Sequence, residues 1–205
     1  MFPSRLDVAP PTPRGAATRE LIVTATAGLM AQGGVAATSL DAVRAATGTS
    51  KSQLYHYFAS KDDLVRAVVR HNGNAVVAAQ RLHDDPPSSP AALGRWRYRV
   101  VAGQRARGFA GGCPLGSLAA ELAGRTDEAT RHELAGAFAR WEGLLASALE
   151  AGVRSGQFPA ALQPTEEAAA LVAAVQGGSL LSAVVDGPAP LQAALDRVLA
   201  TLLPQ

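Results

Sequence analysis

The 205-residue sequence predicts an all-α protein. Hydrophobic residues make up 48% of the chain and aromatic residues only 5%. Ala is abundant while β-branched and aromatic residues are sparse, a balance that favours helices over strands. No stretch alternates polar and apolar residues for long enough to indicate a sheet. The expected architecture is a small N-terminal helical domain joined by a linking helix to a larger helical domain.

The first elements are an arm and one helix. Residues 1–14 are Pro-rich and without pattern, which predicts a disordered arm. From about residue 18 to 32 the apolar positions Leu21, Ile22, Ala25 and Leu29 fall on one helical face. The glycine pair at 33 and 34 is expected to end this helix.

Three helix starts then follow closely, each with a capping hydroxyl three residues before a side chain that reaches back to the N-cap amide. The pairs are Thr38 with Asp41, Ser50 with Gln53, and Ser60 with Asp63. They predict helices over about 39–46, 50–57 and 60–83. The short turn near Gly48 between the first two is the layout of a helix-turn-helix.

The rest of the chain is divided by Pro- and Gly-rich stretches. Helices are expected at about 90–107, 115–123, 127–154, 165–185 and 189–203. The predicted domains are 15–62 for the helix-turn-helix unit and 84–205 for the second unit, with the linking helix at about 60–83.

The helix over 50–57 exposes an unusual set of side chains. Leu54 and Phe58 lie about 40° apart on the helical wheel and are expected to face the core. The opposite side then carries Ser52, Gln53, Tyr55 and His56, with Tyr57 on the flank. Residues 1–61 carry a net charge of +3 against −1 for the remainder. This polar, basic surface suits the phosphate-lined groove of DNA, although Tyr55 and Tyr57 as core filling is the plain alternative.

The stretch "TSLDAVRAATGTSKSQLYHYFASKDDLV" resembles the helix-turn-helix signature of the tetracycline-repressor (TetR/AcrR) family of bacterial transcriptional regulators. The resemblance implies a homodimer that binds double-stranded DNA at a palindromic operator. It also implies that the following residues contact DNA: Thr38, Ser39, Ser50, Lys51, Ser52, Gln53, Tyr55, His56, Tyr57 and Lys61. The family's common "SLYHYF" appears here with Gln53 in first place, a departure at a base-reading position.

The second half is expected to sense a ligand and to dimerise. "FAGGCPLGSLAAEL" resembles the subgroup that includes lincomycin-resistance and flavonoid-responsive repressors. A pocket for a small apolar or aromatic effector is predicted to use Trp96, Phe109, Cys113, Leu115, Phe138, Trp141 and Gln176, for each of which core packing is the alternative. Dimerisation is expected through about residues 165–203, where Leu191, Leu195, Val198 and Leu202 form a helical stripe. An intramolecular helix pair would explain the same stripe.

Other classes of protein find little support. The four histidines lack metal-ligand spacing, and no nucleophile or phosphate-loop motif is recognisable, so we expect no enzyme, no metal and no cofactor. The single cysteine, Cys113, excludes an internal disulfide and fits the cytoplasm. The uncharged stretch 168–185 is too weakly apolar to predict a membrane span.

The sequence thus predicts a transcriptional repressor that leaves its operator when an effector binds. The alternative is a helical small-molecule-binding protein without specific operator binding.

Overall fold

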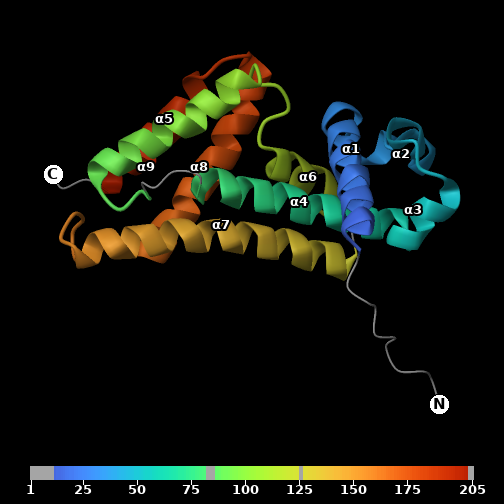
Figure 1. Cartoon of the computed structure of the whole chain (residues 1–205). Helices are drawn as coiled ribbons and strands as arrows, with labels where there is room; N and C mark the ends of the chain where they lie inside the picture. Colours follow the sequence, from blue (N-terminus) through green and yellow to red (C-terminus); the bar gives the residue numbers. More distant parts are fainter. Residues whose placement is uncertain (1–11, 82–85, 125–126, 203–205) are drawn as a thin grey trace. The chain divides into compact units, whose positions relative to one another are not determined.

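The computed structural model of the chain describes residues 12–81, 86–124 and 127–202. Every regular element among these residues is an α-helix (Figure 1). The helices are α1 (Pro13–Ala37), α2 (Leu40–Thr47), α3 (Lys51–Tyr57), α4 (Lys61–Arg81), α5 (Pro90–Ala106), α6 (Pro114–Leu122), α7 (Glu128–Arg154), α8 (Pro164–Val185) and α9 (Ala189–Leu202). The chain divides into two compact units, up to Val68 and from Val69 onward. The predicted all-α class is confirmed.

Helix α1 starts earlier and faces differently than predicted. It begins at Pro13, with the Thr12 hydroxyl accepting from the Gly15 amide, so residues 12–14 are not part of an arm. Residues 1–11 of the predicted arm lie outside the described residues. The buried face carries Ile22, Val23, Thr26 and Met30, whereas Leu21 is 51% exposed.

A buried threonine explains why the hydrophobic pattern of α1 gave the wrong buried face. The Thr26 hydroxyl donates to the Ile22 carbonyl at 2.7 Å, which satisfies it within the helix. A satisfied threonine packs on an apolar face as a small branched residue. The inward face is therefore turned by one residue from the expected position.

Gly34 and Thr38 together end α1 and set up α2. Gly34 has φ 81° and ψ 167°, values outside the helical region, and marks a kink. The Thr38 hydroxyl donates back to the Gly34 carbonyl at 2.8 Å, so Thr38 does not cap the next helix as predicted. Ser39 does, accepting from the Ala42 amide at 3.1 Å.

The core of the N-terminal unit is built from the apolar faces of these short helices. Val43, Leu54 and Phe58 are each no more than 2% exposed, which confirms the helical-wheel prediction for Leu54 and Phe58. Leu64 and Val68 of α4 are also buried. Fixing these side chains orients the remaining surface of α3 outward.

The C-terminal unit packs α4 to α9 at close range. A side chain on Gly73 would meet the Cβ of Ala137 on α7 at 2.8 Å. A side chain on Gly178 of α8 would meet the Cα of Leu191 on α9 at 2.7 Å. Glycine at both positions lets neighbouring helix backbones approach more closely than a larger residue allows.

The leucine stripe of α9 turns inward, which corrects the expectation that it forms the dimer seam. Leu191, Leu195 and Leu202 are fully buried within the chain itself, and Val198 is half-buried. The intramolecular alternative therefore holds for this stripe. The exposed apolar residues lie instead on α8, at Leu180, Leu181, Val184 and Val185.

Helices α1 and α8 are long and apolar enough to pass a length-and-composition test for a membrane span. Core helices of soluble proteins pass the same test. Helix α8 buries Leu171, Val172 and Val175 within the C-terminal unit, as a packed core helix does.

Candidate DNA interface and ligand cavity

The turn between α2 and α3 is fixed by local hydrogen bonds. Gly48 adopts a left-handed conformation with φ 67° and donates its amide to the Arg44 carbonyl at 2.9 Å. The hydroxyls of Thr47 and Thr49 lie 2.8 Å apart, and Thr47 also donates to the Val43 carbonyl. These contacts determine the angle at which α3 leaves α2.

Helix α3 begins with the complete capping box that the sequence predicted. The Gln53 amide donates to the Ser50 hydroxyl at 3.1 Å, and the Gln53 side-chain oxygen accepts from the Ser50 amide at 2.9 Å. A two-point contact of Gln53 with adenine would have to share this oxygen with the cap or withdraw it from the cap. The side-chain NH₂ of Gln53 is not used by the cap and is available to DNA.

The outward face of α3 holds the polar side chains expected there. Lys51, Ser52 and His56 are exposed, and Tyr55 is 48% exposed. Tyr57 is half-buried, with its ring edge-on to His56 at a centroid distance of 5.0 Å. The face therefore offers one cation, several hydrogen-bond donors and an aromatic ring to solvent.

Three further residues of the predicted DNA set lie at neighbouring helix ends. Ser39 and Ser50 are exposed, and each hydroxyl accepts a backbone amide. The Ser39 hydroxyl can still donate to a phosphate, whereas the Ser50 hydroxyl also lies 3.0 Å from the Ser52 hydroxyl, with which it shares a hydrogen bond. Lys61 is half-buried, and its ammonium group donates to the Ala36 carbonyl at 3.4 Å. Thr38 is only 5% exposed and its hydroxyl is engaged, so burial removes it from the exposed set.

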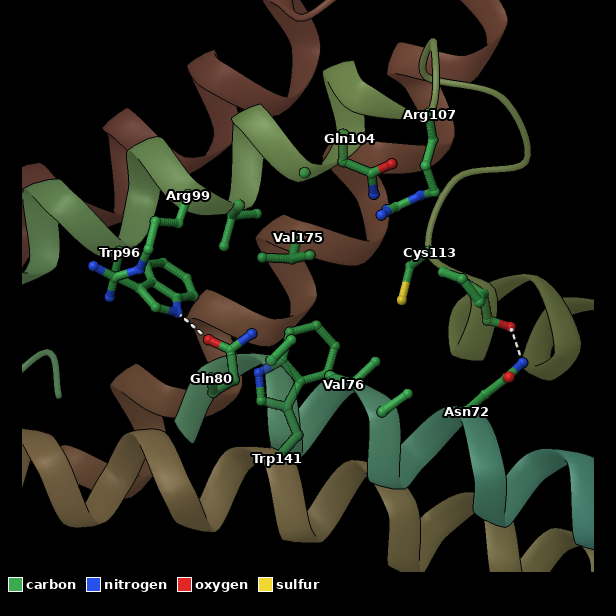
Figure 2. A pocket seen from close by; sticks show the side chains of 15 residues that line it. Asn72, Val76, Gln80, Trp96, Arg99, Gln104, Arg107, Cys113, Trp141 and Val175 are labelled. Atoms are coloured by element: carbon green, nitrogen blue, oxygen red, sulfur yellow. Dashed lines mark hydrogen bonds between the residues drawn. The ribbon is translucent and has the colours of Figure 1, made fainter. Parts of the chain in front are cut away.

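The C-terminal unit contains a cavity of about 340 Å³. This volume falls within the range of small-molecule sites in proteins. Its wall comes from α4, α5, α6, α7 and α8 (Figure 2). The lining residues are Asn72, Ala75, Val76, Ala79, Gln80, Trp96, Arg99, Val100, Gly103, Gln104, Arg107, Cys113, Pro114, Trp141 and Val175.

Several polar groups in the cavity wall are held by hydrogen bonds within the chain. The Trp96 indole N–H donates to the Gln80 side-chain oxygen at 2.5 Å, and Gln104 donates to the Ser179 hydroxyl at 2.8 Å. Asn72 donates to the Pro114 carbonyl at 3.4 Å (Figure 2). Trp141 differs, because its buried indole N–H has no hydrogen-bond partner within the described part of the chain.

The structure brings only part of the predicted ligand set to this cavity. Trp96, Cys113 and Trp141 line it. The other four predicted residues do not.

Each of the four has a structural place elsewhere. Phe109 is buried in the turn after α5, where its φ is 55°, and Leu115 is fully buried core. Phe138 is half-buried on α7. Gln176 packs closely over Gly116, since a Cβ added to Gly116 would collide with the Gln176 side-chain oxygen.

Sequence reasoning missed most polar residues of the cavity. Asn72 and Gln80 belong to α4, which was interpreted only as a linker. Arg99 and Arg107 were not included in the predicted ligand set. The four-residue spacing of Asn72, Val76 and Gln80 was the available signal for one helical face lining a site.

No three His, Cys, Asp or Glu side chains within the described ranges gather as they would around a metal ion. The cavity and the face of α3 both present functional groups to a partner.

Comparisons with known proteins define the class. Residues 22–68 match the family described as bacterial regulatory proteins of the tetR family, and residues 91–198 match the tetracyclin repressor-like C-terminal domain. An uncharacterized HTH-type transcriptional regulator in the lacX 3′ region of Lactococcus lactis is 30% identical over 175 residues. The match covers 80% of this chain and 82% of that protein.

Solved structures agree on the fold. The regulatory protein TetR of Rhodobacter sphaeroides superposes with a TM-score of 0.77 at 22% identity, covering 91% of this chain and 99% of that one. A TetR transcriptional regulator of Chloroflexus aurantiacus gives 0.76 at 21% identity, covering 92% and 96%.

The fold and the exposed recognition helix are those of a helix-turn-helix transcriptional regulator. The chain belongs to the TetR family of bacterial regulatory proteins.

Proposed function

We propose that this regulator is a homodimeric repressor that binds a palindromic operator and releases it when a small effector fills the cavity of the C-terminal unit. The observation that carries the proposal is the polar outer face of α3, held outward by buried Leu54 and Phe58. The companion observation is a cavity of ligand size in the helical C-terminal unit.

The proposed DNA contacts divide by chemistry. Ser39, Ser50 and Lys51 lie at helix starts, where hydroxyls, an ammonium group and backbone amides meet phosphates. Ser52, Gln53, Tyr55 and His56 point outward from α3 and are proposed to approach base edges or the backbone. Tyr57 and Lys61 are proposed to contact the backbone at the edge of this surface.

The first test is a salt titration of operator binding, with the operator selected from sheared genomic DNA. A protein that neutralises about six phosphates loses on the order of a thousandfold in affinity between 50 and 200 mM salt. Lys51→Ala is expected to weaken binding and to reduce the salt slope by about 1, because one phosphate contact is lost. Arg131→Ala, an exposed arginine on α7, is the control and should change neither.

Tyr55→Ala is expected to abolish tight operator binding while the protein stays folded, because the ring is on the surface. Wild-type affinity of this variant at every salt concentration would remove Tyr55 from the interface.

The dimer surface is proposed to be the exposed apolar face of α8. Leu180, Leu181, Val184 and Val185 are 62%, 55%, 76% and 59% exposed and occur in two i, i+4 pairs on adjacent rows of the helix. An apolar face of this kind on a soluble protein marks an interaction surface. Two recognition helices must also be held about 34 to 36 Å apart to reach successive half-sites.

Val184→Arg is expected to give a folded monomer that binds operator DNA weakly, because each subunit would bring an unpaired charge into an apolar interface. Analytical ultracentrifugation measures the mass, and circular dichroism the fold. Ala139→Arg on the exposed side of α7 is the matched control. A Val184→Arg protein that remains dimeric would contradict the proposed surface.

Release is proposed to run through α4, which begins in the N-terminal unit and continues into the wall of the cavity. A ligand that prefers one position of this wall favours one arrangement of the dimer and so changes operator affinity. The protein would act in the cytoplasm, where DNA is available. The alternative, a ligand-binding protein without operator specificity, predicts weak DNA binding without sequence preference.

A further inference from the structure

We propose that the effector is an anion, with an apolar or aromatic body and one carboxylate group held by Arg107. The inference rests on the proposed effector role of the cavity and specifies the chemical class of its ligand. It is carried by the charges, the aromatic walls and one unpartnered donor of the cavity.

Arg107 is placed at the end of α5 to receive such a group. It is the C-cap residue of α5, a position where a cation is favoured by the helix dipole. Its guanidinium turns into the cavity between Gln104 and Cys113 (Figure 2). Within the described ranges no carboxylate pairs with it, whereas Arg97 on the same helix is engaged by Asp196 at 2.5 and 2.8 Å.

An arginine without a carboxylate partner keeps its planar set of N–H donors for a ligand. That geometry matches a carboxylate through two parallel hydrogen bonds. Arg107 therefore offers a specific contact to an anion and only a weaker one to a neutral carbonyl group.

The charge of the cavity wall points the same way. No Asp or Glu is found among the described residues that line the cavity, so no carboxylate of the described wall offsets the charge of Arg107. A positive charge at a cleft raises the local potential and attracts ions of opposite sign. A cationic effector would meet repulsion from Arg107.

The remaining wall fits the body of the ligand. Trp96 and Trp141 are each 2% exposed and, with Val76, Val100 and Val175, provide flat and apolar surfaces. The buried Trp141 N–H lacks an acceptor in the described chain. Such a donor is costly to leave unpaired, and an acceptor atom on the ligand would satisfy it.

The test compares two probes that share a ring system and differ in charge, 2-naphthoate and 2-naphthamide. Both tryptophans of the chain line the cavity, so quenching of tryptophan fluorescence reports occupancy without DNA. The wild type is expected to bind the carboxylate about tenfold more tightly than the amide. Arg107→Gln should remove this preference by weakening 2-naphthoate about tenfold and leaving 2-naphthamide unchanged.

Arg105→Gln is the matched control. Arg105 is an exposed arginine in the last turn of α5 that does not line this cavity, so its loss should leave the preference intact. Benzoate and decanoate extend the carboxylate series to smaller and longer bodies.

Three results would overturn the anion proposal: 2-naphthamide binding as tightly as 2-naphthoate, an unchanged preference in Arg107→Gln, or no binding by any of the three carboxylates. Operator affinity measured with the same probes separates this proposal from the repressor function. If 2-naphthamide binds as tightly and releases DNA, the effector function stands and the anion proposal fails. If 2-naphthoate binds through Arg107 without changing DNA affinity, the anion site stands and effector-driven release fails.

Discussion

The recognition surface and the ligand cavity are built on different length scales. The outer face of α3 depends on hydrogen bonds between residues two to four apart, from the Gly48 turn to the Ser50 cap. The cavity gathers side chains from Asn72 to Val175, supplied by five helices. The recognition surface is thus determined locally, while the cavity exists only when distant helices pack correctly.

Amino-acid substitutions are therefore expected to act differently in the two regions. A substitution of an exposed α3 residue outside the capping box, such as Tyr55, is expected to alter binding without altering the fold, because its side chain lies at the surface. A substitution between the helices of the C-terminal unit shifts a wall of the cavity. Predictions that separate local from cooperative effects therefore test the comparison directly.

The largest effect is expected from Leu54→Ala. Leu54 is 1% exposed, and its truncation leaves a void in a small core at a cost of about 2 to 5 kcal/mol in the free energy of unfolding. Urea denaturation measures the loss. The adjacent Tyr55→Ala should change this free energy by no more than about 0.5 kcal/mol, as an exposed residue does. Equal losses at the two positions would contradict the assigned faces of α3.

Gly178→Ala tests the close packing of α8 on α9. Its Cβ would meet the Leu191 Cα at 2.7 Å, so the helices must move apart at a cost of about 1 to 3 kcal/mol. Gly177→Ala is the neighbouring control, with no atom within 4 Å of the added Cβ. It should stabilise the helix by up to about 1 kcal/mol. Both variants need comparison at one protein concentration, because dimerisation contributes to apparent stability.

Ser50→Ala removes the hydroxyl that caps α3 and should cost about 1 kcal/mol in the free energy of unfolding. The exposed Ser52→Ala, which removes a hydroxyl that does not cap the helix, should stay within about 0.5 kcal/mol of the wild type. Thermal unfolding of the three proteins distinguishes the cap from its neighbour. An unchanged Ser50→Ala protein would mean that tertiary packing alone holds the start of α3.

The smallest change in stability is expected from Trp141→Phe. The variant loses buried ring atoms but also removes the unpartnered N–H, and we expect these opposing effects to leave stability within about 1 kcal/mol of the wild type. Urea denaturation is the measurement. A loss above about 2 kcal/mol would indicate that the indole N–H is already satisfied by bound water.

The sequence predicted helix positions well because their ends carry local chemistry. Prolines at the starts of α5, α6 and α8 fix the boundaries within a residue or two of those expected. The Ser50 and Gln53 capping box was predicted in full. Each of these signals depends on residues only a few positions apart.

The sequence failed where a side chain's environment is set by distant residues. Leu21 was expected on the buried face but is 51% exposed, whereas Thr26 is buried with its hydroxyl bonded to the Ile22 carbonyl. The Leu191 and Leu195 stripe satisfied the pattern of a dimer seam but pairs with α8 of the same chain. A helical stripe indicates that a face is covered, without indicating by which helix.

Cys113 is a single site at which the cavity wall can be labelled chemically. It is the only cysteine of the chain, and its side chain lines the cavity while being 7% exposed. A thiol reagent can therefore attach at one position only, and does so when the wall opens enough to admit it. The rate of labelling therefore reports how often the cavity wall opens, and a ligand bound in the cavity would slow the labelling of Cys113.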